Sequence, residues 1–319
     1  MNRLEKYCGL LERIYGESIV KLFTVKNEND LTLTMNNEYD NQKAKKNYQR
    51  KEKEACTACK SIFRNPNFFK RNLEFPGWIG DLDFSGTTPA KEIMLIGESP
   101  PPLKEQINIA FGLGYYPIER DGKLNFEQLK ETYSEEETLL KKIIKYQVNN
   151  NRLWEYLNLL FLNKLDIIKP KIYISDLCKC NDDTEKKEMW TKCFTECLIK
   201  EIKLINPKLI IFQGGSSYTF VMRYLKSERL IKSKRSILEE TERYYPKPGE
   251  PDYYKKSFSE PCFGRFPLNG KNYYFFKIYH QAYFVRWFKG LEGTQIFNYI
   301  NQNSQFIEKK ILKEVLNIN

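Results

Sequence analysis

Four apolar segments that alternate with helical patterns constrain the fold of this chain more strongly than its other features. They are rich in the β-branched and aromatic residues typical of strands, and they occupy residues 92–97, 171–176, 208–213 and 273–279. Strands that are apolar on both faces are typical of a parallel sheet with helices on both sides. We therefore expect an α/β fold, a three-layer α/β/α sandwich with a central four-stranded parallel sheet.

The segments around these strands indicate helices and two insertions. Helical spacing of apolar residues predicts helices at 4–23, 153–165 and 185–205. The long stretches 104–150 and 225–270 are expected to be insertions that carry extra helices or loops.

The expected organisation has three parts. An N-terminal helix and a basic segment occupy 1–54, a single α/β/α domain occupies 55–300, and a C-terminal helix occupies 301–319. The Lys- and Arg-rich run at 43–53 is interpreted as a helix, a mobile basic arm or simply a solvated face.

The net charge of +11 favours a polyanionic partner such as nucleic acid. AT-rich coding also enriches Lys, Asn and Ile without any selection for binding, which weakens that inference. The 21 Tyr and 21 Phe supply surfaces on which bases stack, although most aromatic residues fill cores. No segment resembles a signal peptide and no apolar run is long enough to span a membrane, so we expect a cytoplasmic, nucleoid-associated protein.

Six of the eight cysteines fall into two groups that together suit a metal centre. Cys56 and Cys59 form a C-x-x-C pair, which fills half of a tetrahedral sulfur site. The second group lies far along the chain and contains Cys178, Cys180, Cys193 and Cys197. Because the chain has one histidine, a Cys2His2 zinc site is not expected. A four-thiolate iron–sulfur or zinc site is one interpretation, and a set of buried free cysteines is the other.

Polar residues follow each of the four predicted strands. The first strand leads into Gly97-Glu98-Ser99, the second ends in Asp176, the third leads into 214–217 and the fourth into His280. In open α/β sheets, ligands bind beyond the C-terminal ends of the strands. We therefore expect two carboxylates and the single histidine to converge at one edge of the sheet.

Five short motifs, in a fixed order, support a family resemblance that covers most of residues 55–290. They are Cys56-Thr-Ala-Cys59, Gly97-Glu-Ser-Pro-Pro101, Ile174-Ser-Asp-Leu-Cys-Lys-Cys180, Pro207-Lys-Leu-Ile-Ile-Phe-Gln-Gly214 and His280-Gln-Ala282. In these motifs the chain resembles the uracil-DNA glycosylase superfamily, and most closely its iron–sulfur, family 4-like branch, as a divergent member. Each motif alone is weak, whereas the shared order makes chance agreement improbable.

The resemblance implies a structural [4Fe–4S] cluster near a DNA-binding face. Its ligands would be Cys56, Cys59, Cys180 and Cys193, with Cys197 as the alternative fourth ligand. Zinc is the alternative metal. No redox chemistry follows from a cluster of this kind.

The resemblance also implies the roles of the residues in a base pocket. Such an enzyme flips a nucleotide out of the duplex and hydrolyses its N-glycosidic bond. Glu98 would orient water and stabilise the cationic sugar, and His280 would donate a hydrogen bond to the pyrimidine O2 as negative charge grows there. Phe111, or Tyr115 as the alternative, would stack on the base, and Ser99 would contact it.

Contacts with DNA are expected from two further segments. Tyr283 or Phe284 would wedge into the vacated base stack, and Arg286 would contact phosphate. Ser216 and Ser217 would offer donors to phosphate from the loop after the third strand. Packing in the core is the alternative role of the aromatic residues.

Asp176 is the most informative departure from the family pattern, which has an asparagine that reads uracil at this position. A carboxylate would repel uracil O4, whereas it accepts a hydrogen bond from the N4 amino group of cytosine. Because cytosine N3 is an acceptor, the best partner would be a protonated Asp176 or a proton shared with N3. An enzyme that removed unmodified cytosine would destroy its own genome, so a 5-substituted cytosine is the more specific hypothesis. Pro101 and Gln281, which also depart from the pattern, would help to reshape the pocket.

The sequence thus predicts a monofunctional DNA glycosylase that acts on a modified cytosine, such as glucosylated hydroxymethylcytosine in phage DNA. One alternative is a uracil-DNA glycosylase of base-excision repair, and another is a catalytically silent binder of modified or damaged DNA. A zinc-stapled α/β protein of unrelated function is a third. DNA is the expected partner of a monomer that needs no nucleotide cofactor.

Overall fold

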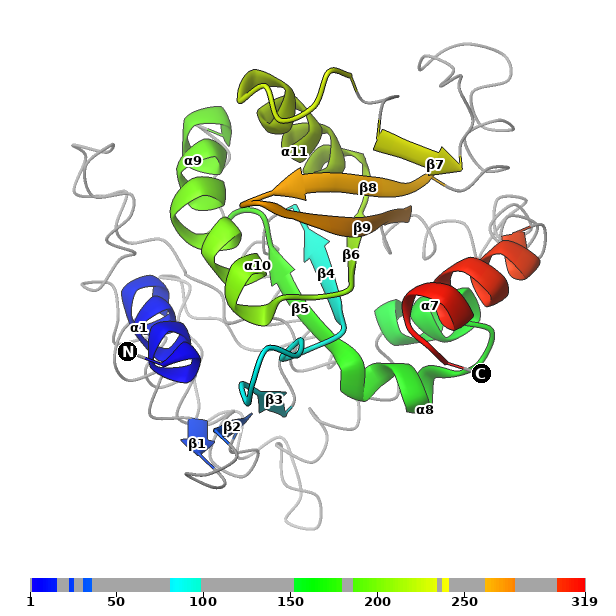
Figure 1. The fold of residues 1–319 in the computed structure, drawn as a ribbon, viewed down its shortest axis with the longest axis horizontal. Coiled ribbons are helices and arrows are strands. Elements are labelled where there is room, and N and C mark those ends of the chain that lie inside the picture. The colour runs from blue at the N-terminus through cyan, green and yellow to red at the C-terminus, as the bar shows by residue number, and fades with distance from the viewer. Residues whose placement is uncertain are drawn as a thin grey trace, which may run out of the picture.

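A six-stranded mixed sheet forms the centre of the computed structural model, with strand order β5-β4-β6-β9-β8-β7 (Figure 1). The structure describes residues 2–15, 23–25, 31–35, 81–98, 152–179, 186–233, 237–240, 262–278 and 303–318. The strands are β4 (Ile93–Gly97), β5 (Ile172–Asp176), β6 (Leu209–Gln213), β7 (Leu238–Glu240), β8 (Cys262–Leu268) and β9 (Lys271–Ile278).

The four parallel strands are the four apolar segments that the sequence predicts. β4 pairs with β5 on one side and β6 on the other, and β6 pairs with β9, all in parallel. All five residues of β4 and of β6 are buried, which is the physical reason for their apolar composition. The prediction of a mixed α/β fold built on a largely parallel sheet is confirmed.

Two antiparallel strands extend this sheet beyond the prediction. β8 pairs with β9 in a tight hairpin whose turn residues Asn269 and Gly270 both have positive φ, 52° and 76°. This is the backbone geometry of a type I′ turn, which Asn-Gly favours. β7 pairs with β8 at the outer edge. Both strands fall within 225–270, where the sequence suggested only an insertion.

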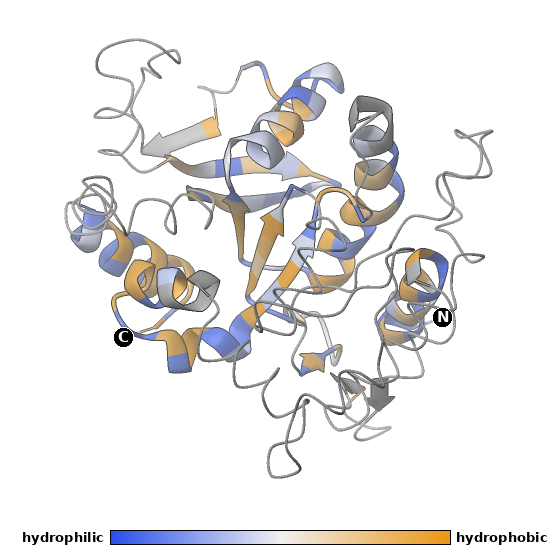
Figure 2. Cartoon of the chain, turned by 180° about the vertical axis from the view of Figure 1, so that it is seen from behind, coloured by the Kyte–Doolittle hydropathy of each residue, from blue (hydrophilic) through white to orange (hydrophobic). Residues whose placement is uncertain are grey.

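Helices pack against both faces of the sheet and bury its side chains in two clusters. One face carries Met94, Ile96 and Phe212 and is covered by helices near the N-terminus and in the middle of the chain. The other face carries Leu95, Ile211 and Phe276 and is covered by α7, α8 and the C-terminal helix. Figure 2 shows hydrophobic residues concentrated on the strands and on the helix sides that face them.

The helices of the first face are α1, α11 and one long segment at 186–205. That segment joins α9 (Lys186–Cys193), a π-helical turn η3 (Phe194–Leu198) and α10 (Ile199–Ile205). It matches the helix predicted at 185–205 and ends at Asn206, which adopts the left-handed conformation. The remaining bounds are α1 (Arg3–Tyr15) and α11 (Gly215–Ser227).

The opposite face is covered by shorter elements and by the C-terminal helix. They are α7 (Arg152–Leu160), α8 (Leu165–Ile168), a 3-10 turn η2 (Lys169–Lys171), and a helix at 303–315 whose π-helical part is η5 (Ile307–Val315). Within the described ranges, no helix is long and apolar enough to cross a membrane.

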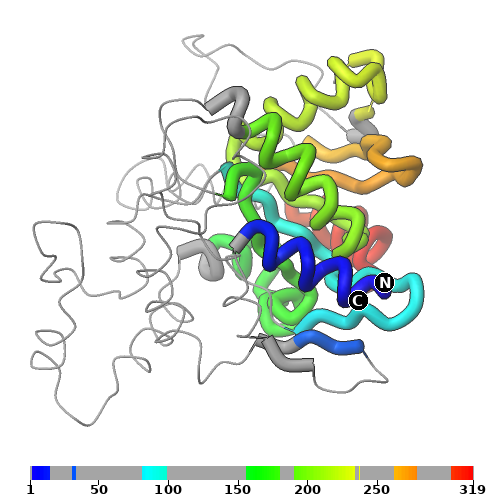
Figure 3. The backbone as a smooth tube through the Cα atoms, turned by 90° about the vertical axis from the view of Figure 1, so that its left-hand side faces the viewer, coloured from blue at the N-terminus to red at the C-terminus, as the bar shows by residue number. Residues whose placement is uncertain are grey.

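The N-terminal helix joins the body of the protein through α10. Figure 3 shows α1 alongside this part of the chain, and the guanidinium of Arg3 donates to the carbonyls of Leu204 at 2.6 Å and Ile205 at 3.0 Å. A small antiparallel sheet lies next to it, formed by β1 (Phe23–Val25), β2 (Thr32–Met35) and β3 (Leu82–Asp83). The basic run at 43–53 lies outside the described residues.

Candidate base-recognition site at the sheet edge

The C-terminal ends of the parallel strands place three residues side by side. Gly97 of β4 is in register with Asp176 of β5, and Ile96 is in register with Phe212 of β6. The next residue of β6, Gln213, is therefore the neighbour of Gly97 on the other side. Residues level with one another in a sheet share a face, so Asp176 and Gln213 point the same way and flank Gly97.

Gly97 allows the Asp176 carboxyl group to lie directly above the sheet. A Cβ atom at position 97 would lie 2.1 Å from Asp176 Oδ1, far inside van der Waals contact, and 4.0 Å from Gln213 Oε1. The side chains of Asp176 and Gln213 thus approach the same point from opposite sides, and the missing side chain of Gly97 leaves the room that the Asp176 carboxyl occupies.

Gln213 is not among the site residues that the sequence predicts. It is 6% exposed, and no hydrogen-bond partner of its Nε2 lies among the described residues. A signal was present in the sequence, because a single amide ends an otherwise apolar strand immediately before two glycines.

Two backbone hydrogen bonds hold the loops after β4 and β5 together. Leu177 N donates to Gly97 O at 3.1 Å, and Cys178 N donates to Glu98 O at 3.0 Å. The structure thereby places Glu98 and Asp176 at the same edge of the sheet. Glu98 is half-buried and is the last described residue after β4.

The environment of Asp176 favours its neutral form more than water does. Burial raises the pKa of this carboxyl from 3.8 to about 6, an effect that Lys179 opposes and Glu201 reinforces. At neutral pH the group is still mostly ionised, so it acts mainly as a hydrogen-bond acceptor. It would gain a proton under mildly acidic conditions.

A buried ion pair anchors the loop just after Asp176. Lys179 Nζ lies 2.5 Å from Glu201 Oε2, and the two side chains are 1% and 0% exposed. Burial alone would lower the pKa of Lys179, but its interaction with Glu201 outweighs burial and raises it. The lysine is therefore charged at every pH at which the protein would be studied.

Three hydroxyl groups complete this buried network. Ser175 Oγ donates to Glu201 Oε2 and Tyr173 Oη donates to Glu201 Oε1, both at 3.0 Å, while Lys179 Nζ also donates to Ser175 Oγ. Tyr7 of α1 donates to Tyr173 Oη at 2.9 Å. The network joins α1, β5 and α10, and it fixes the end of β5 from the side of the sheet opposite to Asp176.

The cysteine-bearing segments meet beside this network. Cys178 and Cys193 are buried, and their Sγ atoms lie 3.8 Å apart. Cys197 is also buried, one turn further along the helical segment. Cys56, Cys59 and Cys180 lie outside the described residues. In the part of the chain that the structure describes, no three His, Cys, Asp or Glu side chains could together hold a metal ion.

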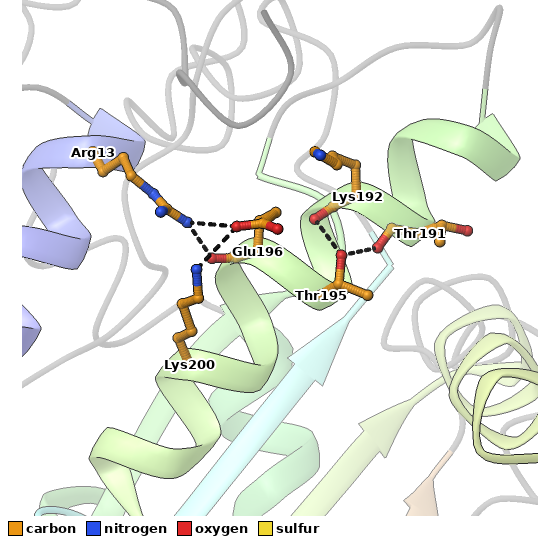
Figure 4. Close-up of polar contacts among 6 residues, drawn as sticks. All are labelled: Arg13, Thr191, Lys192, Thr195, Glu196 and Lys200. Atoms are coloured by element: carbon orange, nitrogen blue, oxygen red, sulfur yellow. Dashed lines mark hydrogen bonds and ion pairs between the residues drawn. The ribbon is translucent and has the colours of Figure 1, made fainter. Parts of the chain in front are cut away.

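The π-helical turn that carries Cys197 is fixed by charged contacts to α1 (Figure 4). Arg13 Nη2 donates to Glu196 O at 2.6 Å and to Glu196 Oε2 at 3.2 Å, and Lys200 Nζ lies 2.9 Å from Glu196 Oε2. Thr195 Oγ1 donates to Thr191 O at 2.9 Å. π-helical turns often occur at functional sites, because they insert a residue without breaking the helix.

The residues expected to contact phosphate begin α11. Ser217 is fully buried, and its hydroxyl donates to Gln213 O at 3.3 Å and to Ile96 O at 3.5 Å. Its role in the described structure is thus to join the ends of β4 and β6. Ser216 is exposed on the first turn of α11, where backbone N–H groups favour anions.

Several expected site residues lie outside the described part of the chain, so their roles stay predictions. They are Ser99, Phe111, Tyr115, His280, Tyr283, Phe284 and Arg286. The last described residue of the strand before His280 is Ile278, whose carbonyl accepts a hydrogen bond from Gly214 N at 2.9 Å. β9 therefore ends at the same edge as β4, β5 and β6.

Comparison with known proteins identifies the family. The model of the uracil DNA glycosylase superfamily matches residues 84–305, which include the whole six-stranded sheet and the edge that carries Asp176. No curated protein sequence matches the chain significantly.

Proposed function

Because the chain belongs to the uracil DNA glycosylase superfamily, we propose that it is a monofunctional DNA glycosylase specific for a 5-substituted cytosine. The enzyme hydrolyses the N-glycosidic bond of a flipped nucleotide and leaves an abasic site. The observation that carries this proposal is the position of Asp176, whose carboxyl group lies above Gly97 at the ligand-binding edge of the sheet.

The chemistry of Asp176 favours cytosine over uracil. With a pKa of about 6, the carboxyl is mostly ionised at neutral pH and accepts a hydrogen bond from the cytosine N4 amino group. Uracil presents the O4 oxygen at the same place, and two acceptors facing each other in a buried site repel. Ordinary cytosine is spared, because the pocket requires a substituent at C5 for productive binding.

Two residues carry the hydrolysis. Glu98 orients a water molecule toward C1′ and stabilises the positive charge of the sugar as the glycosidic bond breaks. The base leaves with the electron pair of that bond, and His280 donates a hydrogen bond to its O2, where negative charge accumulates. Water adds to C1′ and loses a proton, and the released base gains one, so the reaction is a simple hydrolysis.

The DNA is held by groups on both sides of the pocket. Ser216 contacts a phosphate at the start of α11, and Arg286 contacts another, while Tyr283 or Phe284 fills the gap that the flipped nucleotide leaves. Phe111, or Tyr115, and Ser99 contact the base itself. The positive net charge assists the approach to DNA.

The thiols suit the structural [4Fe–4S] cluster of the family's iron–sulfur branch, to which we assign this chain as a divergent member. The loop that leads to Cys180 runs against the helix that carries Cys193, as the 3.8 Å contact between Cys178 and Cys193 indicates. Cys56 and Cys59 would supply the remaining ligands, with Cys197 as an alternative to Cys193 and zinc as the alternative metal. A bound cluster would join distant segments, and this chain's own carboxylates and histidine would carry the hydrolysis.

The substrate suggests a biological role. Hypermodified cytosines, such as glucosylated hydroxymethylcytosine, occur in the DNA of some phages, so a cytoplasmic, monomeric enzyme of this specificity would act in antiviral defence. The resulting abasic sites would block replication of the modified genome.

A base-release assay tests the proposal. Duplexes and single strands that contain uracil, cytosine, hydroxymethylcytosine or its glucosylated form are incubated with wild type, Asp176→Asn, Glu98→Gln and Asp166→Asn. Release of only a modified cytosine, abolished in Glu98→Gln and lost or redirected to uracil in Asp176→Asn, is the expected result. Asp166 is an exposed carboxylate on α8, so its variant should behave as wild type. Release of uracil alone by wild type would instead indicate base-excision repair, and binding without release would indicate a silent binder.

A further inference from the structure

We propose that Gln213 is a second base-reading residue, whose side-chain amide donates a hydrogen bond to N3 of the flipped cytosine. This inference rests on the proposed function and deepens it, because it assigns the part of the base that Asp176 cannot read. Gln213 has no role among the motifs that indicate the family.

The first observation is an unpaired amide in a buried position. Gln213 is 6% exposed, and within the described ranges its Nε2 has no hydrogen-bond partner. Burying an amide donor without an acceptor is unfavourable, and a methionine of similar shape would fill the same space without that cost. A polar side chain that weakens the fold in this way is expected where a ligand completes its hydrogen bonds.

The second observation is the position of this amide relative to Asp176. Both side chains belong to one row across β5, β4 and β6, and Gly97 between them has no side chain. Gln213 Oε1 comes to 4.0 Å, and Asp176 Oδ1 to 2.1 Å, from the point where a Cβ of residue 97 would lie. The two side chains therefore lie on either side of Gly97 at the C-terminal edge of the sheet, and the Asp176 carboxyl reaches over the glycine.

Cytosine presents a donor at N4 followed by an acceptor at N3. An ionised Asp176 satisfies N4 and has no proton to offer N3. The Gln213 amide supplies that proton, so the pair matches the edge of a neutral cytosine without requiring a protonated aspartate. Because an amide can also turn to accept from the N3–H of uracil, Asp176 provides the rejection of uracil and Gln213 provides affinity and orientation.

The test combines a protein change with a matching substrate change. Wild type and Gln213→Met are compared on the modified cytosine and on its 3-deaza analogue, in which a C–H replaces N3. For the normal substrate we expect kcat/KM to fall about 10- to 100-fold in Gln213→Met. For the analogue the two proteins should differ by no more than about twofold, since the contact is already absent.

Other outcomes would overturn the inference. If Gln213→Met lowers kcat/KM equally on both substrates, Gln213 acts only through the fold. If wild type has the same kcat/KM on the analogue as on the normal substrate, a contact with N3 is excluded without any variant. If Gln213 serves only to hold Asp176, the acid limb of the pH profile should move in Gln213→Met, whereas N3 recognition leaves the limb in place. Thermal unfolding checks that the variant folds, and we expect it to be at least as stable as wild type.

A binding experiment separates failure of this inference from failure of the proposed function. If wild type releases no cytosine derivative, duplexes that carry 2′-fluoro nucleotides, which resist cleavage, are used as ligands. Tighter binding of the modified cytosine than of its 3-deaza analogue, lost in Gln213→Met, would support the inference for a silent binder. Equal binding of the two duplexes would overturn it, as would release of uracil alone.

Discussion

Replacing Lys179 by methionine should destabilise the protein strongly, because the lysine neutralises a carboxylate that is completely buried. Lys179 and Glu201 are 1% and 0% exposed, and their charged atoms lie 2.5 Å apart. In Lys179→Met, Glu201 would keep the hydrogen bonds from Tyr173 and Ser175 but lose its only cation among the described residues. Breaking a buried pair in this way costs about 3–5 kcal/mol, a large part of the roughly 5–15 kcal/mol that stabilises a typical protein.

A double variant separates the loss of the charge interaction in Lys179→Met from a general loss of packing. Lys179→Met/Glu201→Gln removes both charges; the glutamine oxygen can accept from one of the hydroxyls of Tyr173 and Ser175, and its NH2 group can donate to the other. We expect this double variant to recover more than half of the free energy of unfolding lost in Lys179→Met. Urea denaturation of wild type, both single variants and the double variant gives the coupling energy.

A surface pair on the same helical segment provides the matched control. Lys200 and Glu196 lie 2.9 Å apart, but their side chains are 43% and 36% exposed. Lys200→Met should therefore cost less than about 1 kcal/mol. If Lys179→Met cost no more than Lys200→Met, the view that the buried pair anchors the end of β5 would be wrong.

Four further predictions concern the edge of the sheet and its supports. Gly97→Ala would place a Cβ 2.1 Å from Asp176 Oδ1, so base release should fall at least about 100-fold while the far-UV circular dichroism is retained; activity within twofold of wild type would refute this. The rate on modified cytosine should rise as pH increases through about 6, where Asp176 ionises, and the pH–rate profile of Asp176→Asn on uracil, to which that variant should be redirected, should lack this limb. Because the pKa of Asp176 is raised in the folded protein, its ionised form lowers the stability above about pH 6. This cost disappears below about pH 4, where the carboxyl is protonated in both the folded and the unfolded protein. In urea denaturation, Asp176→Asn should therefore be more stable than wild type at pH 7.5, and the difference should vanish on acidification. Tyr7→Phe removes the hydrogen bond to Tyr173 and should lower the free energy of unfolding by about 1 kcal/mol, measured in the same way; no change would indicate that this hydrogen bond does not help to hold α1.

The parallel part of the sheet was predictable because its two central strands, β4 and β6, are buried on both faces and so carry a nearly continuous apolar pattern. β8 was not predictable in this way. Its sequence, Cys262–Leu268, contains a glycine, an arginine and a proline, and its exposed Arg265 interrupts the pattern. Only the pairing with β9 reveals it, and pairing between segments is not a local property of a sequence.

The site was predictable in proportion to how far its residues match known motifs. Glu98 and Asp176 could be placed at one edge because each directly follows or ends a predicted strand. Gln213 was overlooked because it was taken as part of a strand of apolar residues. That its amide nitrogen has no hydrogen-bond partner among the described residues becomes visible only in three dimensions. The partner of Lys179 was equally hidden, since Glu201 is one of many glutamates on helices and its burial depends on the packing of α10.

The alternation of side chains along β5 has a consequence for how this enzyme could acquire new specificities. Tyr173 and Ser175 point toward α10 and join the buried network, whereas Asp176 points to the other side of the sheet. Substitutions at 176 and 213 therefore leave the hydrogen bonds of Glu201 untouched. Selection can exchange the proposed base-reading residues one at a time, without the lineage passing through an unfolded intermediate. An ancestral reader of uracil and a descendant that recognises another pyrimidine could thus share one unchanged scaffold.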